Sequence, residues 1–156
     1  MSPAPVLELR GVCKSYGAQR VVEDLSLTVR RGEVVALLGP SGCGKTTILQ
    51  MAANVVGPDR GQVVRRALRI GYVFQEPHLI SWRSALENVL FVAGPGRRER
   101  EELRPRAVGL LVALGLGAAM HAYPRALSGG MRQCVSIARM LVGGPELLLM
   151  DDPYPR

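Results

Sequence analysis

The stretch that most constrains the fold is GPSGCGKTT, a glycine-rich segment at residues 39–47. It follows a continuous apolar run, residues 34–38, of the kind seen in buried parallel strands, and it precedes a helical pattern. Glycines let backbone N–H groups wrap a polyphosphate, and a helix N-terminus adds its positive end. In this motif Lys45 would neutralise phosphate oxygens and Thr46 would offer its hydroxyl to Mg²⁺. The segment therefore predicts an α/β protein with a phosphate-binding loop between a strand and a helix.

Hydrophobic periodicity predicts the elements around this loop. Residues 6–12 and 25–29 alternate apolar and polar side chains, as half-buried antiparallel strands do. The helix after the loop places apolar side chains on one side, and Gly57 is its expected C′ residue.

The second half of the chain begins with short strands and becomes mainly helical. Residues 62–64 and 70–75 are predicted strands, and helical periodicity runs from about 84 to 141. The last apolar run, residues 146–151, returns to a buried strand and ends in aspartates. Ligands collect at the carboxyl edge of a parallel sheet, so Asp151 is expected to ligate Mg²⁺, usually through water.

Composition indicates a soluble single domain: 156 residues, 47% hydrophobic and 21% charged. The net charge of +7 comes almost wholly from arginine and suits nucleic acid, an anionic membrane face or anionic small molecules. The run RREREELRPR, residues 97–106, is interpreted as the solvated face of a helix rather than a nucleic-acid patch. Residues 107–120 are apolar but too short and glycine-rich to span a membrane, and predict a buried helix and its exit.

The cysteines and the N-terminus indicate the compartment. Cys13, Cys43 and Cys134 show neither metal-ligand nor disulfide spacing, which favours reduced thiols in the cytosol. The first residues lack a basic segment followed by an apolar one, so no secretory signal is expected. Cys43 lies near a helix N-terminus, an environment that can lower a thiol pKa, although its small size alone also explains its presence there.

A further motif, LSGGMRQ at residues 127–133, decides the family to which the sequence is similar. Together with GPSGCGKTT, YVFQEP and ELLLMDDP in that order, it closely resembles the nucleotide-binding subunit of ATP-binding-cassette (ABC) transporters. The resemblance implies a P-loop NTPase core with an antiparallel β subdomain and a helical signature subdomain. Residues 1–156 would form one nucleotide-binding domain, truncated at the C-terminus, with the helical subdomain at about 84–143.

The resemblance also implies a role for each motif. Tyr16 would stack on adenine, unless it is only a packing aromatic, and Gln75 would ligate Mg²⁺ or the attacking water. The signature motif would direct a helix N-terminus at the γ-phosphate of ATP held by a second subunit. The ATP-binding residues would be Tyr16, Gly39, Pro40, Ser41, Gly42, Cys43, Gly44, Lys45, Thr46 and Thr47. The metal ligands would be Thr46, Gln75 and Asp151, the catalytic residues Lys45, Gln75 and Asp152, and the signature residues Leu127, Ser128, Gly129, Gly130 and Gln133.

The sequence departs from the family pattern at its C-terminal end. Asp152 stands where the family has glutamate, and the shorter side chain withdraws the carboxylate by roughly 1.5 Å. Misplacement on the order of 1 Å can cost about 100-fold in rate, so slow hydrolysis at best is expected. The chain ends at Arg156, before the strand and switch histidine that the family has next, and two central strands are therefore expected to lack their shared neighbour.

The segment QEPHLISWRSALENV, residues 75–89, looks most like importers of nitrate, sulfonates and taurine. Trp82 would either pack on a transmembrane partner or fill the helical subdomain. The implied cofactors are ATP and Mg²⁺. The implied partners are transmembrane permease subunits, a second nucleotide-binding subunit and, indirectly, a periplasmic or extracellular solute-binding protein, with no nucleic acid.

The expected location is cytoplasmic, at the inner face of the cell membrane. The leading interpretation is an importer's ATP-binding subunit with weak or no hydrolysis. The alternatives are a non-catalytic nucleotide-binding regulator, an inactive fragment and, less favoured, a soluble ABC ATPase of DNA repair or translation.

Overall fold

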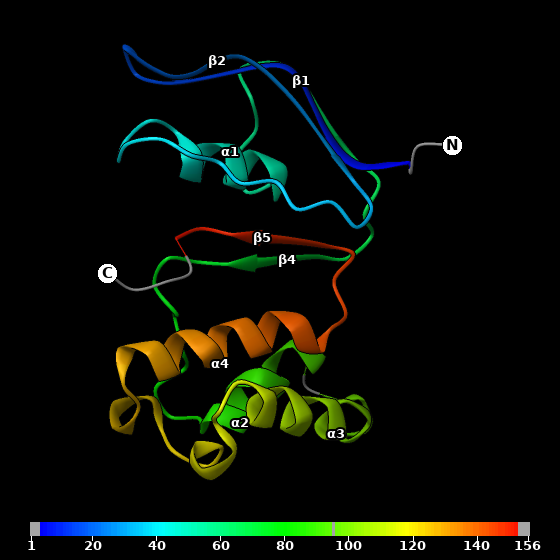
Figure 1. Ribbon diagram of the computed structural model, residues 1–156, viewed down its shortest axis with the longest axis vertical. Coiled ribbons are helices and arrows are strands. Elements are labelled where there is room, and N and C mark those ends of the chain that lie inside the picture. The colour runs from blue at the N-terminus through cyan, green and yellow to red at the C-terminus, as the bar shows by residue number, and fades with distance from the viewer. Residues whose placement is uncertain (1–3, 95, 153–156) are drawn as a thin grey trace. The chain divides into compact units, whose positions relative to one another are not determined.

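The computed structural model describes residues 4–94 and 96–152, which form two compact units that divide between Ile70 and Gly71. The first unit is built on a long antiparallel hairpin of β1 (Pro5–Tyr16) and β2 (Gln19–Arg30) (Figure 1). Strand β3 (Arg60–Arg65) pairs with the other edge of β1, giving the order β2-β1-β3. The predicted antiparallel strands are thereby confirmed, although each extends further than the alternating pattern alone indicated.

Helix α1 (Lys45–Ala52) belongs to the same unit and contacts all three strands. The fully buried side chains of the unit are Leu7, Leu9, Val12 and Met51. Arg65 of β3 donates from Nε to the carbonyl of Ala52 at 2.8 Å and from Nη2 to that of Met51. The C-terminal carbonyls of α1, which have no partner within a helix, are thus satisfied by the sheet.

The predicted C-terminus of α1 at Gly57 is wrong. The helix ends at Ala52, Ala53 is its C-cap, and Asn54 adopts a left-handed conformation with φ of 64°. Asparagine tolerates this conformation better than other side chains do, so the chain turns earlier than the next glycine. Val55, expected on the apolar face, is mostly exposed as a result.

The predicted strand at residues 34–38 is also wrong. The segment is irregular, and Val34 and Leu38 are 95% and 91% exposed. A strand needs a hydrogen-bonded neighbour, and within the two described ranges none pairs with this segment. Apolar composition made the run look like a core strand, but burial in a sheet depends on neighbours that composition does not supply.

The second unit contains a pair of parallel strands, β4 (Ile70–Val73) and β5 (Leu147–Met150), joined by a long helical crossover (Figure 1). The prediction of strands in these two places is confirmed. Asp151 donates its backbone N–H to the carbonyl of Val73 at 2.9 Å, which fixes the register at the carboxyl ends of both strands.

The crossover consists of α2 (Ala85–Val89), η1 (Leu90–Ala93), α3 (Arg97–Ala113), η2 (Gly117–Ala119), η3 (Pro124–Ala126) and α4 (Gly129–Val142). Their shared core includes Val89, Ala107, Leu111, Leu116 and Val135. The arginine-rich start of α3 is largely exposed, as predicted, and buried residues appear from Ala107 onward. Among the described residues, no helix has the length and apolar character needed to cross a membrane.

Candidate nucleotide-binding site

The phosphate loop of the first unit is shaped by glycines in unusual backbone conformations. Gly42 and Gly44 have φ of 81° and 96°, in the left-handed region that other residues rarely adopt. A Cβ at Gly44 would lie 2.7 Å from the carbonyl oxygen of Val21 and 3.4 Å from Cγ2 of Val22. The loop therefore lies so close to β2 that only glycine fits immediately before α1.

Lys45 folds back into this loop. Its Nζ donates to the carbonyl oxygens of Gly39 at 2.8 Å and Pro40 at 2.9 Å. Helix α1 begins at Lys45 with no side-chain cap and no acidic residue in its first turn. The loop thus combines an ammonium group with an uncapped helix N-terminus, and both features favour an anion.

Tyr16 lies at the end of β1, beside the turn that leads into β2. Its side chain is 49% exposed, and Nζ of Lys14 lies 5.7 Å from its ring centroid. Lys14 in turn pairs with Asp59 at 2.7 Å, and Asp59 accepts the backbone N–H of Ser15 at 2.7 Å. Hydrogen bonds from Lys14 and then Ser15 lower the pKa of Asp59. These contacts fix the end of β1 while leaving the ring of Tyr16 open to a stacking partner.

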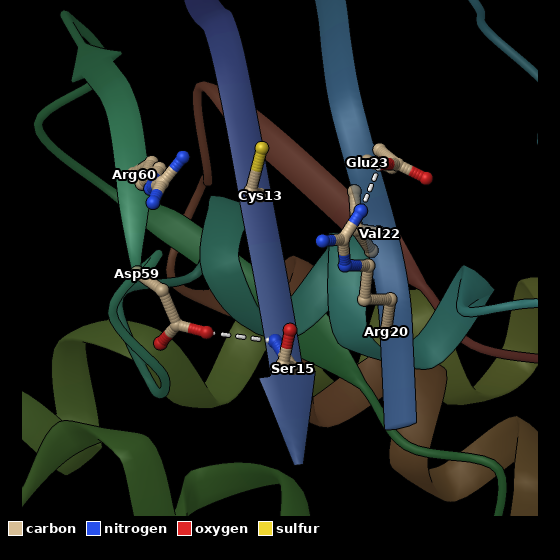
Figure 2. Close-up of a pocket in the computed structure, with 7 residues that line it drawn as sticks. All are labelled: Cys13, Ser15, Arg20, Val22, Glu23, Asp59 and Arg60. Atoms are coloured by element: carbon tan, nitrogen blue, oxygen red, sulfur yellow. Dashed lines mark hydrogen bonds and ion pairs between the residues drawn. The ribbon is translucent and has the colours of Figure 1, made fainter. Parts of the chain in front are cut away.

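A cavity of about 330 Å³ lies on the sheet next to these residues (Figure 2). It is lined by Cys13, Ser15, Arg20, Val22, Glu23, Asp59 and Arg60. The sequence analysis predicted none of these as a site. Its charges largely neutralise one another, since Arg20 pairs with Glu23 at 2.7 Å and Asp59 is held by β1. The cavity therefore has no strong preference for an anion or a cation.

The second unit brings two of the predicted metal ligands to one sheet edge. Asp151 follows β5 and is buried, whereas Gln75 follows β4 and is exposed. The Tyr72 hydroxyl lies 3.3 Å from Oδ2 of Asp151 and donates to it. Burial first, and the nearby Asp151 charge second, raise the pKa of Tyr72 to about 12. The Tyr72 hydroxyl therefore stays protonated and donates a hydrogen bond at physiological pH. The sequence did not predict this contact between Tyr72 and Asp151.

Asp152 differs from Asp151 in both exposure and backbone conformation. It is exposed and has φ of 42°, in the left-handed region. Aspartate is one of the few residues with a side chain that adopts this conformation readily. Its carboxylate is therefore accessible to water, while that of Asp151 is held against β4.

The signature motif forms the N-terminus of α4. Ser128 is the N-cap and its hydroxyl accepts the backbone N–H of Met131 at 3.2 Å, while Leu127 is buried beneath it. Gly129 and Gly130 are exposed, and a Cβ at either would meet nothing within 4 Å. Gln133 is buried and donates from Nε2 to the Phe74 carbonyl at 3.3 Å, so its amide already has a partner within this unit.

Comparison with known proteins decides the family. The family description "ABC transporter" matches residues 22–155. This chain belongs to the ABC transporter family. The predicted resemblance is thereby confirmed, and the motifs above are those of an ABC ATP-binding cassette.

The similar curated proteins in the ABC transporter family are import subunits. This chain is 43% identical to the aliphatic sulfonates import ATP-binding protein SsuB 2 of Burkholderia lata, over 96% of this chain and 56% of that protein. It is 40% identical to the SsuB protein of Corynebacterium glutamicum, over 99% of this chain and 63% of that protein. The chain thus spans about half to two thirds of the length of these relatives.

Solved ABC cassettes share the fold. A dimeric structure of MJ0796, a bacterial ABC transporter cassette, aligns with a TM-score of 0.83 and 30% identity over 94% of this chain and 74% of that one. The same cassette in a post-hydrolysis dimer with ADP and Pi aligns with a TM-score of 0.82 and 28% identity over 95% and 74%. The predicted α/β cassette fold is therefore confirmed.

Proposed function

We propose that this chain binds MgATP at residues 39–47 and serves as the nucleotide-binding subunit of an importer for sulfonates or similar solutes. The observation that carries the proposal is the loop itself. Only glycine fits beside β2 at position 44, α1 begins there with no side-chain cap, and Nζ of Lys45 bonds back to the loop carbonyls. A polyphosphate would replace the Gly39 and Pro40 carbonyls as the partner of Lys45.

The residues available for Mg²⁺ fit a nucleotide-bound ion. In the part of the chain that is described, no group of three or more His, Cys, Asp and Glu side chains could hold a metal alone. Magnesium commonly takes one or two protein ligands, with phosphates and waters completing its shell. Thr46, Gln75 and Asp151 supply oxygens of this kind, and Tyr16 would stack on the adenine with its exposed ring.

Isothermal titration calorimetry tests nucleotide binding directly. Lys45→Ala is expected to weaken MgATP binding at least about tenfold, because charge-assisted hydrogen bonds are worth about 1.5–3 kcal/mol. Arg98→Ala is the matched control: it removes a positive charge from the exposed face of α3, where Arg98 pairs with Glu102 at 3.0 Å. The proposal is contradicted if both variants lose MgATP affinity to the same extent, or if the unsubstituted chain does not bind MgATP.

Hydrolysis is proposed to be slow, because Asp152 replaces the family's glutamate. The aspartate side chain is one methylene shorter than that of glutamate, which withdraws its carboxylate by about 1.5 Å. A water bound to this carboxylate would therefore lie further from the reacting phosphate. Asp152→Glu should raise the ATPase rate and Asp152→Asn should abolish what remains. A rate of zero in all three proteins, with MgATP still bound, favours the non-catalytic nucleotide-binding regulator instead.

A second nucleotide-binding subunit is proposed to complete the site. Among the described residues, none contacts Gly129 or Gly130 closely enough to require glycine, and α4 has no acidic residue in its first turn. The glycines leave space at the N-terminus of α4, and the absence of an acid there keeps the electrostatic potential positive. Both would favour the γ-phosphate of a nucleotide bound to another subunit. The solved dimer of a related cassette supports this arrangement.

A transmembrane permease is the proposed membrane partner, with location at the inner face of the membrane and indirect dependence on a solute-binding protein. Trp82 is 77% exposed, so it does not fill the helical core, and exposed apolar side chains of this size are typical of interfaces. Trp82→Ala should weaken assembly with permease subunits without changing MgATP affinity. Unchanged assembly would exclude Trp82 from that interface.

A further inference from the structure

Arg139 is a buried arginine whose hydrogen-bond partners belong to the loop that carries Gln75. It lies on α4 and is 8% exposed. Nη1 donates to the carbonyl of His78 at 3.1 Å, and Nη2 donates to the carbonyl of Pro77 at 2.8 Å. The planar guanidinium is thus used as a fork on two consecutive carbonyls, which a lysine cannot reproduce.

The same loop is held at a second point by the same helix. The Gln133 amide donates to the carbonyl of Phe74 at 3.3 Å. Gln133 and Arg139 are about 9 Å apart along the axis of α4, at 1.5 Å per residue. Their bonds fall on either side of Gln75, so α4 determines where that residue lies.

The loop conformation needs such external bonds. His78 has φ of 42°, in the left-handed region that only a few per cent of non-glycine residues adopt, histidine more often than most. The rings of His78 and Phe74 meet edge to face at 5.6 Å, which brings the two ends of the loop together. The Arg139 side chain is costly to bury, since burial lowers the pKa of the guanidinium and its Nε has no hydrogen-bond partner among the described residues. The two bonds to the loop offset this cost.

We propose that Arg139 is a positioning residue: through its hydrogen bonds to the Pro77 and His78 carbonyls it fixes the Gln75 loop to α4, the helix whose N-terminus carries the signature glycines. Gln75 and Ser128 then belong to one rigid assembly. A shift of the α4 N-terminus moves Gln75 with it. Positioning of Gln75 toward Mg²⁺ rests on the proposed function, whereas attachment of the loop to α4 does not.

Hydrogen–deuterium exchange without nucleotide tests the attachment. In Arg139→Lys and Arg139→Met, the backbone amides of residues 75, 76 and 78–80 should exchange at least about tenfold faster, because the loop loses its charge-assisted fork to α4. Amides in α3 should keep their rates. Arg106→Met is the matched control, since Arg106 is exposed and donates to the Leu141 carbonyl of α4, not to the loop. Unchanged rates at residues 75, 76 and 78–80, or equal acceleration throughout residues 71–152, would overturn the proposal.

A double-mutant cycle then tests the positioning of Gln75. The measured quantity is the gain in ATP affinity on adding Mg²⁺ to chelator-treated protein. Gln75→Ala and Arg139→Lys should each reduce this gain, and the double variant should reduce it no further, because both act through one side chain. Additive losses contradict the positioning role. If the unsubstituted chain binds no nucleotide, the proposed function fails, while the exchange experiment still decides whether Arg139 holds the loop.

Discussion

The glycines of the phosphate loop lie just before α1 and those of the signature motif form the first turn of α4, and different structural causes act on the two sets. At Gly44 a Cβ would collide with the Val21 carbonyl, and the backbone is left-handed. At Gly129 and Gly130 a Cβ would meet no described atom within 4 Å, and neither has a positive φ. The fold of this chain therefore explains the first glycine, and the proposed second nucleotide-binding subunit would explain the other two.

The largest expected effect follows from Gly44→Ala. The substitution places a methyl group 2.7 Å from a backbone oxygen at φ of 96°, so the loop must shift by more than a side-chain rotation. We expect MgATP affinity to fall at least about 100-fold, because misplacement on the order of 1 Å has effects of that size. Calorimetric titration measures it. If this variant binds MgATP as tightly as the parent does, the close approach of β2 does not make glycine necessary at position 44.

Gly129→Ala should leave the fold intact and abolish association. Alanine is about 0.5–1 kcal/mol better than glycine within a helix, so the free energy of unfolding should stay level or rise slightly. MgATP-dependent dimerisation, followed by sedimentation velocity, should disappear. A variant that dimerises as the parent does would show that these glycines serve no neighbouring subunit.

Ser128→Ala and Ser84→Ala separate helix capping from recognition. Both serines are N-caps whose hydroxyls accept a backbone N–H, from Met131 in α4 and from Glu87 in α2. Loss of either cap should cost about 1 kcal/mol in denaturant unfolding. Only Ser128→Ala should also weaken MgATP-dependent association, and an equal effect of Ser84→Ala would attribute the loss to stability alone.

The smallest effect concerns pH, and it distinguishes the cap of α2 from that of α4. The hydrogen bonds from the Ser84 backbone and hydroxyl lower the pKa of Glu87 below its ordinary value of 4.5. A carboxylate whose folded pKa is depressed stabilises the fold above its unfolded pKa, and that stabilisation is lost as pH falls through the folded value.

Glu87→Gln should therefore reduce the free energy of unfolding by less than about 1 kcal/mol near neutral pH, and by progressively less as the pH falls below the ordinary value of 4.5. Denaturant unfolding at neutral pH and at a series of acidic pH values measures this difference. Ser128→Ala is the control, because α4 has no acidic residue in its first turn. The loss of unfolding free energy in this variant should not vary with pH over the same range. A pH-independent cost of Glu87→Gln would contradict the assigned cause.

Local patterns predicted the parts of this molecule whose conformation is set locally. The alternating strands and the start of the helix after the glycine-rich loop follow from nearby residues, and each lies where the sequence indicated. Residues 34–38 do not form the predicted strand, because pairing requires a neighbour that apolar composition alone does not guarantee. The sequence also offered no indication of the role of Arg139. Its hydrogen bonds join residues about sixty positions apart, and a short sequence pattern cannot predict such a contact.

The measurement that tests the central claim most directly is calorimetric MgATP binding to Gly44→Ala and Gly129→Ala, side by side with the unsubstituted chain at concentrations where it is monomeric. The account predicts that Gly129→Ala binds as the parent does and that Gly44→Ala does not bind measurably. If both variants lose binding, or both retain it, the two glycine motifs do not have the separate roles inferred from their surroundings.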